Sequence, residues 1–211
     1  ELFFLDKTPR YYLIIDEIVE LFPDAKFIFL FRNPLHVYAS IVNTWGNKRF
    51  NKLFSTYDDI IFGTPKLSKA YIKHQDKSLS LKYEDLILNS DIELKKLFNY
   101  LGLEYKKQVL NKFSQQNTKG DLGDPTGTKI YSKISTEGLN KWETTFNSII
   151  RKRFAIRLIN KLNDKDLSVQ GYSKLRIKKN VRALRGGNNF LLFRDLVDYC
   201  ISYIIRKFKL Y

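Results

Sequence analysis

A short apolar run between two helix-like segments constrains the fold of this chain most. Lys26 to Phe31 reads KFIFLF, and a Pro-Asp break separates it from a preceding segment whose apolar residues recur at helical spacing. Arg-Asn-Pro follows at positions 32–34, and then another segment with helical spacing. A continuous apolar strand is typical of a parallel sheet that is covered on both faces. Helix, buried strand and helix in succession therefore predict an α/β fold.

A second strand follows the same pattern. Ser78 to Tyr83 reads SLSLKY and is expected to be a strand, with the acidic pair Glu84-Asp85 at its exit. Asp91 to Leu101 has the spacing of an amphipathic helix, and Gly102 is the residue type that commonly lies just past a helix end. Strands that lead into helices favour a parallel sheet flanked by helices.

The other segments are expected to alternate between helices and loops. The predicted helices are Lys66 to Gln75, Tyr105 to Phe113, and Ser135 or Thr136 to about Leu162. Gly46 to Pro65 is expected to contain loops, and Asn117 to Gly127 is a loop rich in Gly, Asp and Asn.

Length and charge divide the chain into a body and a tail. The chain has 211 residues, of which 44% are hydrophobic, so it can bury a substantial core. Its formal net charge is +15, and the stretch from Lys165 to Tyr211 carries eleven Lys and Arg against three Asp. We expect a domain over residues 1–163 and a basic helical C-terminal extension over 164–211. The extension either covers the domain or contacts a membrane surface, and both interpretations stay open.

The start of the chain and its single cysteine bear on cellular context. The chain begins Glu-Leu-Phe-Phe and contains no Met, so a segment upstream of Glu1 is expected. Cys200 is the only cysteine, which favours a cytoplasmic location, with the Golgi lumen as the alternative if an N-terminal anchor precedes. One Cys and two His without ligand spacing predict no metal site.

Arg32 stands where an α/β sheet binds its ligands, just beyond the carboxyl end of a strand. Asn33 can cap the following helix, Pro34 suits its first turn, and free N–H groups there favour an anion. Ser40 comes eight residues after Arg32 and can reach back along the helix. Together these groups predict a phosphate cradle. On this stretch alone, an arginine paired with a surface carboxylate and a serine satisfied within its helix is an equal alternative.

Three motifs in order resemble the sulfotransferases that use 3′-phosphoadenosine 5′-phosphosulfate. They are KTPRY at 7–11, FPDAKFIFLFRNPLHVYAS at 22–40 and LSLKYEDL at 79–86. FNYLGL at 98–103, the later GDPTGTK loop and Trp142 are also similar to that family, so the resemblance covers about residues 6–142. It implies a P-loop NTPase-like fold and transfer of a sulfuryl group to a hydroxyl or an amine.

The resemblance also implies roles for single residues. Arg32 and Ser40 match the arginine and serine that hold the 3′-phosphate, and Tyr83 matches a tyrosine near the adenine. Lys7 matches a catalytic lysine whose charge stabilises oxygen charge in the transition state. His36 is expected to be structural, although histidine suits proton transfer at neutral pH.

A flap and two upstream parts complete what the resemblance implies. Lys119, Gly120 and Lys129 lie where the family closes a loop over the nucleotide. The loop that wraps the 5′-phosphosulfate, and the general base, belong upstream of Lys7 in the family, and nothing here matches them.

Several functions remain to be separated. Carbohydrate is the first expectation for the acceptor and a tyrosyl peptide the second, and no metal and no nucleic acid are expected to take part. The alternatives are a P-loop nucleotide kinase and a basic module that binds nucleic acid or a membrane surface, since the charge of +15 suits either acidic partner.

Overall fold

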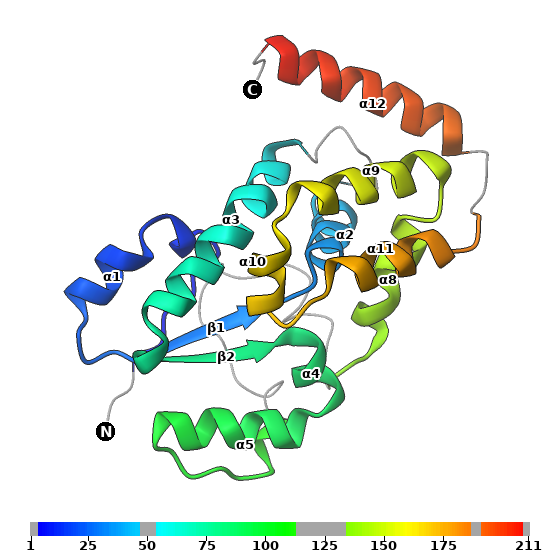
Figure 1. Ribbon diagram of the computed structural model, residues 1–211. Coiled ribbons are helices and arrows are strands. Elements are labelled where there is room, and N and C mark those ends of the chain that lie inside the picture. The colour runs from blue at the N-terminus through cyan, green and yellow to red at the C-terminus, as the bar shows by residue number, and fades with distance from the viewer. Residues whose placement is uncertain (1–3, 47–53, 113–133, 187–190, 209–211) are drawn as a thin grey trace.

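A two-stranded parallel sheet surrounded by helices forms the frame of the molecule (Figure 1). The computed structural model describes residues 4–46, 54–112, 134–186 and 191–208. β1 (Phe27–Phe31) pairs in parallel with β2 (Ser78–Lys82), with Phe27 opposite Ser78 and Phe31 opposite Lys82. The predicted α/β class and both predicted strands are confirmed, although helices make up most of the described chain.

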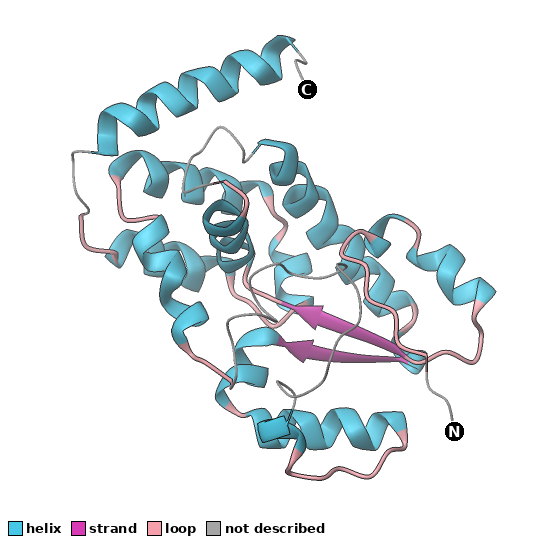
Figure 2. Cartoon of the chain, turned by 180° about the vertical axis from the view of Figure 1, so that it is seen from behind, coloured by secondary structure: helices cyan, strands magenta, loops and turns pink. Residues whose placement is uncertain are grey.

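The helical elements of the described ranges follow one another closely along the chain. They are η1 (Tyr11–Leu13), α1 (Ile15–Leu21), α2 (Pro34–Thr44), α3 (Phe54–Lys73), η3 (Gln75–Lys77), α4 (Tyr83–Leu88), α5 (Ser90–Leu101), α6 (Val109–Lys112), α8 (Glu137–Thr145), α9 (Ile149–Lys161), α10 (Asp164–Val169), α11 (Lys174–Ala183) and α12 (Leu191–Phe208). α4 and α5 adjoin β2, and α5 lies on the other side of the sheet from α3 and α10 (Figures 1 and 2). As predicted, α5 ends at Gly102, which has a left-handed φ of 75°.

Only one face of β1 is buried within the described structure. Phe29 and Phe31 pack against Ala70 of α3, and the Tyr71 ring meets both edge-on, with ring centroids 5.5 and 5.7 Å apart. Ile28 and Leu30 point to the opposite face and are 36% and 51% exposed. The expectation of a strand buried on both faces is wrong for these residues, because α3 covers only one side of the strand.

The main hydrophobic core lies between α2 and the later helices. Tyr38 of α2 is fully buried, and its ring contacts Phe146 and Phe154 at centroid distances of 5.8 and 4.9 Å. Leu167 of α10 and Val181 of α11 are fully buried in the same cluster. The core therefore joins residues from both sides of position 163.

Tertiary packing changes the predicted helix boundaries. α3 begins at Phe54 and runs through Pro65, so the loop expected over Gly46 to Pro65 is wrong from Phe54 onward. Proline removes one intrahelical hydrogen bond. The bond that is lost would have reached the Ile61 carbonyl, four residues earlier. Close by, the Thr64 carbonyl accepts from Gln170 Nε2, just past α10, at 2.9 Å, and Ser68 Oγ donates to the Asp166 carbonyl of α10 at 3.0 Å. These two bonds hold α3 against α10.

The long helix predicted to about Leu162 is two helices. α8 ends at Thr145, and α9 starts again at Ile149. Ser148 is the N-cap of α9, and its Oγ accepts from the Arg151 N–H at 3.2 Å. Serine at this position favours a new helix start over continuation. The helix predicted from Tyr105 is likewise reduced to the four residues of α6.

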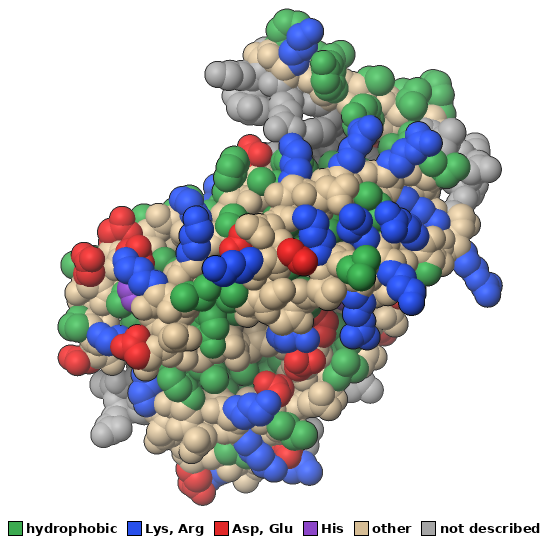
Figure 3. Space-filling view, in the orientation of Figure 1, with side chains coloured by type: hydrophobic (Ala, Val, Ile, Leu, Met, Phe, Trp, Pro, Cys, Tyr) green, Lys and Arg blue, Asp and Glu red, His purple; other side chains and the backbone are tan. Residues whose placement is uncertain are grey.

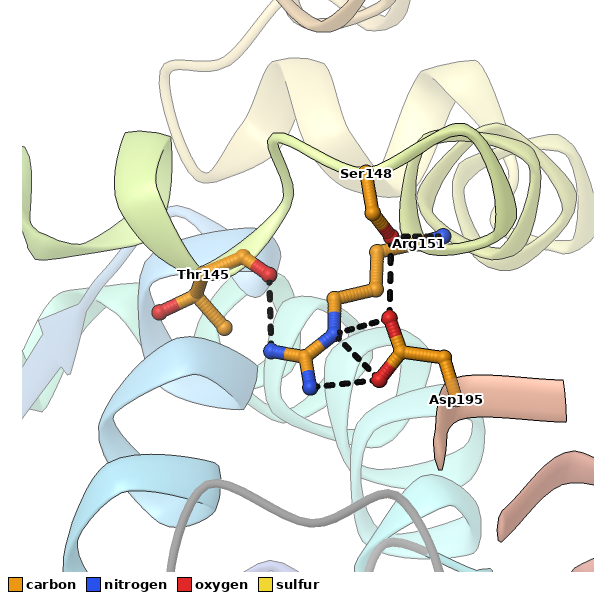
Figure 4. Close-up of polar contacts among 4 residues, drawn as sticks. All are labelled: Thr145, Ser148, Arg151 and Asp195. Carbon is orange, nitrogen blue, oxygen red and sulfur yellow. Dashed lines mark hydrogen bonds and ion pairs between the residues drawn. The ribbon is translucent and has the colours of Figure 1, made fainter. Parts of the chain in front are cut away.

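The C-terminal extension folds into helices, and α12 contacts α9. A buried polar cluster joins the two, as Figure 4 shows. Arg151 of α9 donates from Nη2 to Asp195 Oδ1 at 2.7 Å and from Nε to both carboxylate oxygens at 3.0 and 3.1 Å. Ser148 Oγ donates to Asp195 Oδ2 at 3.0 Å, and Arg151 Nη1 donates to the Thr145 carbonyl at 3.2 Å. None of the helices described here has the length and hydropathy needed to span a membrane.

Candidate functional site

Two residues predicted for one ligand meet at the carboxyl ends of the strands. Arg32 follows the last residue of β1, and Tyr83 follows the last residue of β2 as the first residue of α4. The Arg32 guanidinium carbon lies 4.2 Å from the centre of the Tyr83 ring, a cation–π contact. Parallel pairing of β1 with β2 brings the two strand exits to the same edge of the sheet. The structure therefore brings together residues separated by about fifty positions.

Arg32 is a cation with unused donors. Its Nη2 donates to the Gly138 carbonyl at a long 3.4 Å, and its buried Nε has no hydrogen-bond partner among the described residues. No carboxylate in the described ranges forms an ion pair with it either, so the alternative of a surface carboxylate partner finds no support there. A buried donor without an acceptor costs free energy, about 1–3 kcal/mol, until an acceptor arrives. The geometry favours an anion at this place.

The start of α2 contributes less than the sequence suggested. Asn33 caps the helix, and its Oδ1 accepts from the Leu35 N–H at 3.0 Å, as predicted. The Asn33 carbonyl accepts from the N–H groups of His36 and Val37 at 2.8 and 3.0 Å. Pro34 has no N–H, so the first turn has no free donor left. The expectation of free N–H groups is therefore wrong, and the helix dipole is what the start of α2 could offer an anion.

Glu84 ties the two strand exits together. Its Oε1 accepts from the Asn33 N–H at 3.1 Å and lies 3.2 Å from His36 Nδ1, and its Oε2 accepts from the Tyr172 hydroxyl. Burial by itself raises the pKa of the Glu84 carboxyl, but the contacts with His36, Tyr172 and Asn33 outweigh it and lower that pKa to about 2. With its oxygens engaged in this way, Glu84 fixes the turn that carries Arg32.

Tyr172 reaches Glu84 because the backbone before it comes close to β2. Gly171 has a left-handed φ of 78°, and a Cβ at this position would lie 2.9 Å from Cδ of Lys82. Glycine adopts the left-handed backbone without strain, whereas the close contact could be relieved by a shift of the flexible Lys82 side chain. The hydrogen bond to Glu84 and burial together raise the pKa of the Tyr172 hydroxyl, burial being the larger cause. The C-terminal extension thus supplies one residue that supports the site.

Ser40 lies on the face of α2 that α8 covers. One turn before it, His36 stacks on Trp142 with ring centroids 5.4 Å apart, and one turn after it, Asn43 donates to Thr145 Oγ1 at 3.0 Å. Ser40 itself is half-buried and forms no hydrogen bond to another described residue. The structure therefore gives His36 a packing position and leaves the Ser40 hydroxyl available.

A cavity opens next to Arg32, and Lys7 is not among the described residues that line it. The cavity has a volume of about 250 Å³ and lies between the N-terminal segment, the end of β1, α2 and α3. Pro9, Arg10 and Tyr12 line it on one side, and Arg32 lines it on the other. Lys7 is exposed, two residues before Pro9.

Three predicted site residues, Lys119, Gly120 and Lys129, fall outside the described residues. The structure also adds two residues that the sequence did not predict for the site. Gly138 and Tyr172 contact the site from 106 and 88 residues away, and no local sequence pattern marks either of them. The described residues contain no group of three or more His, Cys, Asp or Glu that could hold a metal ion.

Replacing Glu84 by glutamine is expected to destabilise the protein by roughly 1–3 kcal/mol, because an amide cannot accept all the donors that the carboxylate serves. The folded-state pKa of Glu84, about 2, is below its ordinary value of 4.5. Its contribution is therefore present above about pH 4.5 and is lost as the pH falls towards 2. Urea unfolding between pH 7 and pH 2.5 should show this loss in the parent protein and a smaller one in Glu84→Gln.

Asp85→Asn is the matched control for Glu84→Gln. Asp85 is adjacent in sequence and half-exposed, and it forms only a 3.4 Å ion pair with Lys82. A change of at most about 0.5 kcal/mol is expected for this variant. Equal losses in the two variants would mean that Glu84 does not fix the turn as described.

Comparison with known proteins shows which family this chain is similar to. Residues 1–107 match the model of the sulfotransferase family. A Caenorhabditis briggsae protein assigned as a protein-tyrosine sulfotransferase is 24% identical over 200 residues, which cover 90% of this chain and 67% of that protein. The nodulation protein NoeE of Sinorhizobium fredii is 29% identical over 120 residues, covering 47% of this chain and 28% of NoeE.

A bacterial relative with a different acceptor is also similar. Omega-hydroxy-beta-dihydromenaquinone-9 sulfotransferase Stf3 of Mycobacterium tuberculosis is 30% identical over 110 residues, covering 46% of this chain and 28% of Stf3. The match with this chain thus spans little more than a quarter of NoeE and of Stf3. No solved structure matches the chain. Since the family model covers half of the chain, the protein belongs to the sulfotransferase family.

Proposed function

We propose that this chain is the nucleotide-binding part of an enzyme that transfers a sulfuryl group from 3′-phosphoadenosine 5′-phosphosulfate to a hydroxyl. The observation that carries the proposal is Arg32, whose buried Nε has no acceptor in the described part of the chain while its guanidinium lies on the Tyr83 ring. A 3′-phosphate would accept from this arginine, and the Ser40 hydroxyl would add a second donor. The proposed fold is the P-loop NTPase-like one of this donor's enzymes.

In the proposed reaction the acceptor oxygen attacks the sulfur in line with the phosphosulfate bond. The S–O bond to the 5′-phosphate breaks, 3′,5′-adenosine bisphosphate leaves, and the acceptor proton passes to a general base. Lys7 stabilises the negative charge that builds on the transferred group and the leaving oxygen. Lys119, Gly120 and Lys129 are proposed to close over the nucleotide. None of the described residues is assigned as the base.

The acceptor is proposed to be a carbohydrate hydroxyl. The cavity beside Arg32 is lined by an aromatic ring, Tyr12, and by the Arg10–Asp59 ion pair, whose Nη2 and Oδ2 lie 3.0 Å apart. Aromatic surface and paired donors and acceptors together suit the faces and the hydroxyls of a sugar. Two relatives are named after acceptors that also carry a hydroxyl: protein tyrosine for the Caenorhabditis briggsae protein and an omega-hydroxy dihydromenaquinone for Stf3. A tyrosyl peptide is the second candidate.

Calorimetric titration with 3′,5′-adenosine bisphosphate and with ADP tests the donor assignment. At about 0.15 M salt, which screens nonspecific attraction to the basic surface, the intact protein is expected to bind the bisphosphate at least tenfold more tightly than ADP. A preference for ADP or ATP would instead identify a nucleotide kinase.

Transfer of labelled sulfate to a hexose oligomer and to a tyrosyl peptide, measured in parallel, identifies the acceptor.

A further inference from the structure

α12 faces the body of the protein with its acidic side. Asp195 and Asp198 are both fully buried, and Asp195 pairs with buried Arg151 of α9. Arg157 of α9 also donates to the Tyr199 hydroxyl, at 3.3 Å. A surface helix of a globular protein usually buries its apolar side. In α12 the buried arginine beneath it requires a counter-charge, so the acidic side turns inward.

The apolar side of α12 therefore points to solvent. Phe193 is 76% exposed, Tyr203 59% and Ile204 49%. The other large apolar residues exposed on the helix are Leu196, Val197, Tyr199, Ile201 and Phe208. Figure 3 shows apolar side chains along this helix at one end of the molecule. A continuous apolar surface of this kind on a soluble domain marks an interaction site.

The neighbouring helices supply positive charge next to this apolar side. α9 and α11 contain ten Lys and Arg and no Asp or Glu. Their exposed members define the α9/α11 basic surface, which consists of Arg153, Arg157, Lys161, Arg176, Lys179 and Arg182. In Figure 3 the blue side chains gather over α9, which contacts α12, and over α11, which packs against α9. Buried Arg151 is compensated by Asp195, whereas none of the exposed cations of this surface forms an ion pair with a carboxylate of the described residues. Arg157 and Lys161 keep only a hydrogen bond to the Tyr199 hydroxyl and a contact with the Tyr57 ring.

We propose that α12 and the α9/α11 basic surface together bind an anionic lipid membrane. α12 lies flat at the headgroup level with its apolar residues inserted, and the basic surface attracts the anionic headgroups. A second copy of the chain fits less well, because a twofold interface would bring the two basic surfaces face to face. A nucleic acid would use the charge but would leave Phe193 and Ile204 in water.

Vesicle co-sedimentation of the intact protein tests the proposal. We expect binding at about 0.15 M salt to phosphatidylcholine vesicles that contain roughly one third phosphatidylglycerol, and at least tenfold weaker binding to phosphatidylcholine alone. Replacing Phe193, Tyr203 and Ile204 together by serine should lower partitioning into the anionic vesicles at least tenfold. Replacing Arg176, Lys179 and Arg182 by glutamine should lower it by roughly tenfold to a hundredfold and remove most of its salt dependence.

Matched controls separate membrane binding from a loss of folding. Leu21, Leu88 and Ile92 have comparable exposure but lie outside α12, so their triple replacement by serine should leave vesicle binding unchanged. Because all the substituted side chains are exposed, far-UV circular dichroism and nucleotide binding should stay at parent values. Equal binding to neutral and anionic vesicles, or undiminished binding by the α12 variant, would overturn the proposal. So would a dimer in analytical ultracentrifugation that the α12 variant abolishes, or a DNA duplex that binds more tightly than the vesicles do.

Discussion

Replacing Arg32 by alanine is expected to weaken binding of 3′,5′-adenosine bisphosphate about 10- to 150-fold and to leave binding of ADP nearly unchanged. A hydrogen bond to a charged group contributes about 1.5–3 kcal/mol, and each 1.4 kcal/mol is a factor of ten in affinity. The bisphosphate carries a 3′-phosphate that ADP lacks, so the loss should be selective. Calorimetry of the two nucleotides with parent and variant measures it.

The stability of the nucleotide-free protein is an independent test of the Arg32→Ala variant. Because Arg32 Nε has no partner among the described residues, its removal deletes only the contact with Tyr83 and a long bond to Gly138. The free energy of unfolding is expected to fall by at most about 1 kcal/mol. A large loss of stability with unchanged nucleotide affinity would assign Arg32 a structural role instead.

Arg157→Ala is the matched control for Arg32→Ala. Arg157 lies on α9 and also contacts a tyrosine, through its 3.3 Å hydrogen bond to the Tyr199 hydroxyl. Its removal should not change the preference for the bisphosphate over ADP. Arg32→Lys should recover part of the affinity, because lysine keeps the charge but cannot present two parallel donors to a phosphate.

Replacing Asp195 by alanine is expected to produce the largest loss of stability among these variants. It leaves the Arg151 guanidinium buried at the α9–α12 interface without its counter-charge, and breaking one side of such a pair costs about 3–5 kcal/mol. If α12 separates from α9, water can reach Arg151 and the buried charge is relieved. The loss of stability in this variant therefore cannot exceed the free energy needed to separate α12 from α9. Hydrogen exchange of the α12 amides should therefore accelerate at least a hundredfold, alongside a lower midpoint of urea unfolding.

The double variant Arg151→Met, Asp195→Leu separates the charge effect from the packing effect. It removes both charges and keeps apolar volume, so much of the lost stability should return, as observed in general when a buried pair is replaced by apolar groups. Asp24→Asn, at an exposed turn position, is the control for a simple change in net charge and should alter stability by less than about 0.5 kcal/mol. Unchanged exchange in Asp195→Ala would show that the ion pair does not hold α12.

The sequence by itself determined the local features of the site. The apolar runs predicted β1 and β2, with Arg32 just beyond the first strand and Tyr83 as the last residue of the second, and Asn33 and Pro34 predicted the start of α2. These predictions succeeded because strand composition, helix caps and the residues next to them are fixed within a few positions of the chain. The family resemblance rests on the same short segments.

Only the tertiary structure decided which distant groups meet. The hydrogen bonds of Glu84 to Asn33 and to Tyr172 cross 51 and 88 positions, so no local pattern encodes them. A tertiary hydrogen bond from Gln170 to the Thr64 carbonyl accompanies the passage of α3 through Pro65, where local propensity alone predicts a break. For α12 the sequence predicted a basic helical extension, but not which side of the helix faces the body. Buried Arg151 draws Asp195 inward and turns the apolar side outward, because an uncompensated buried charge costs more than exposed apolar side chains.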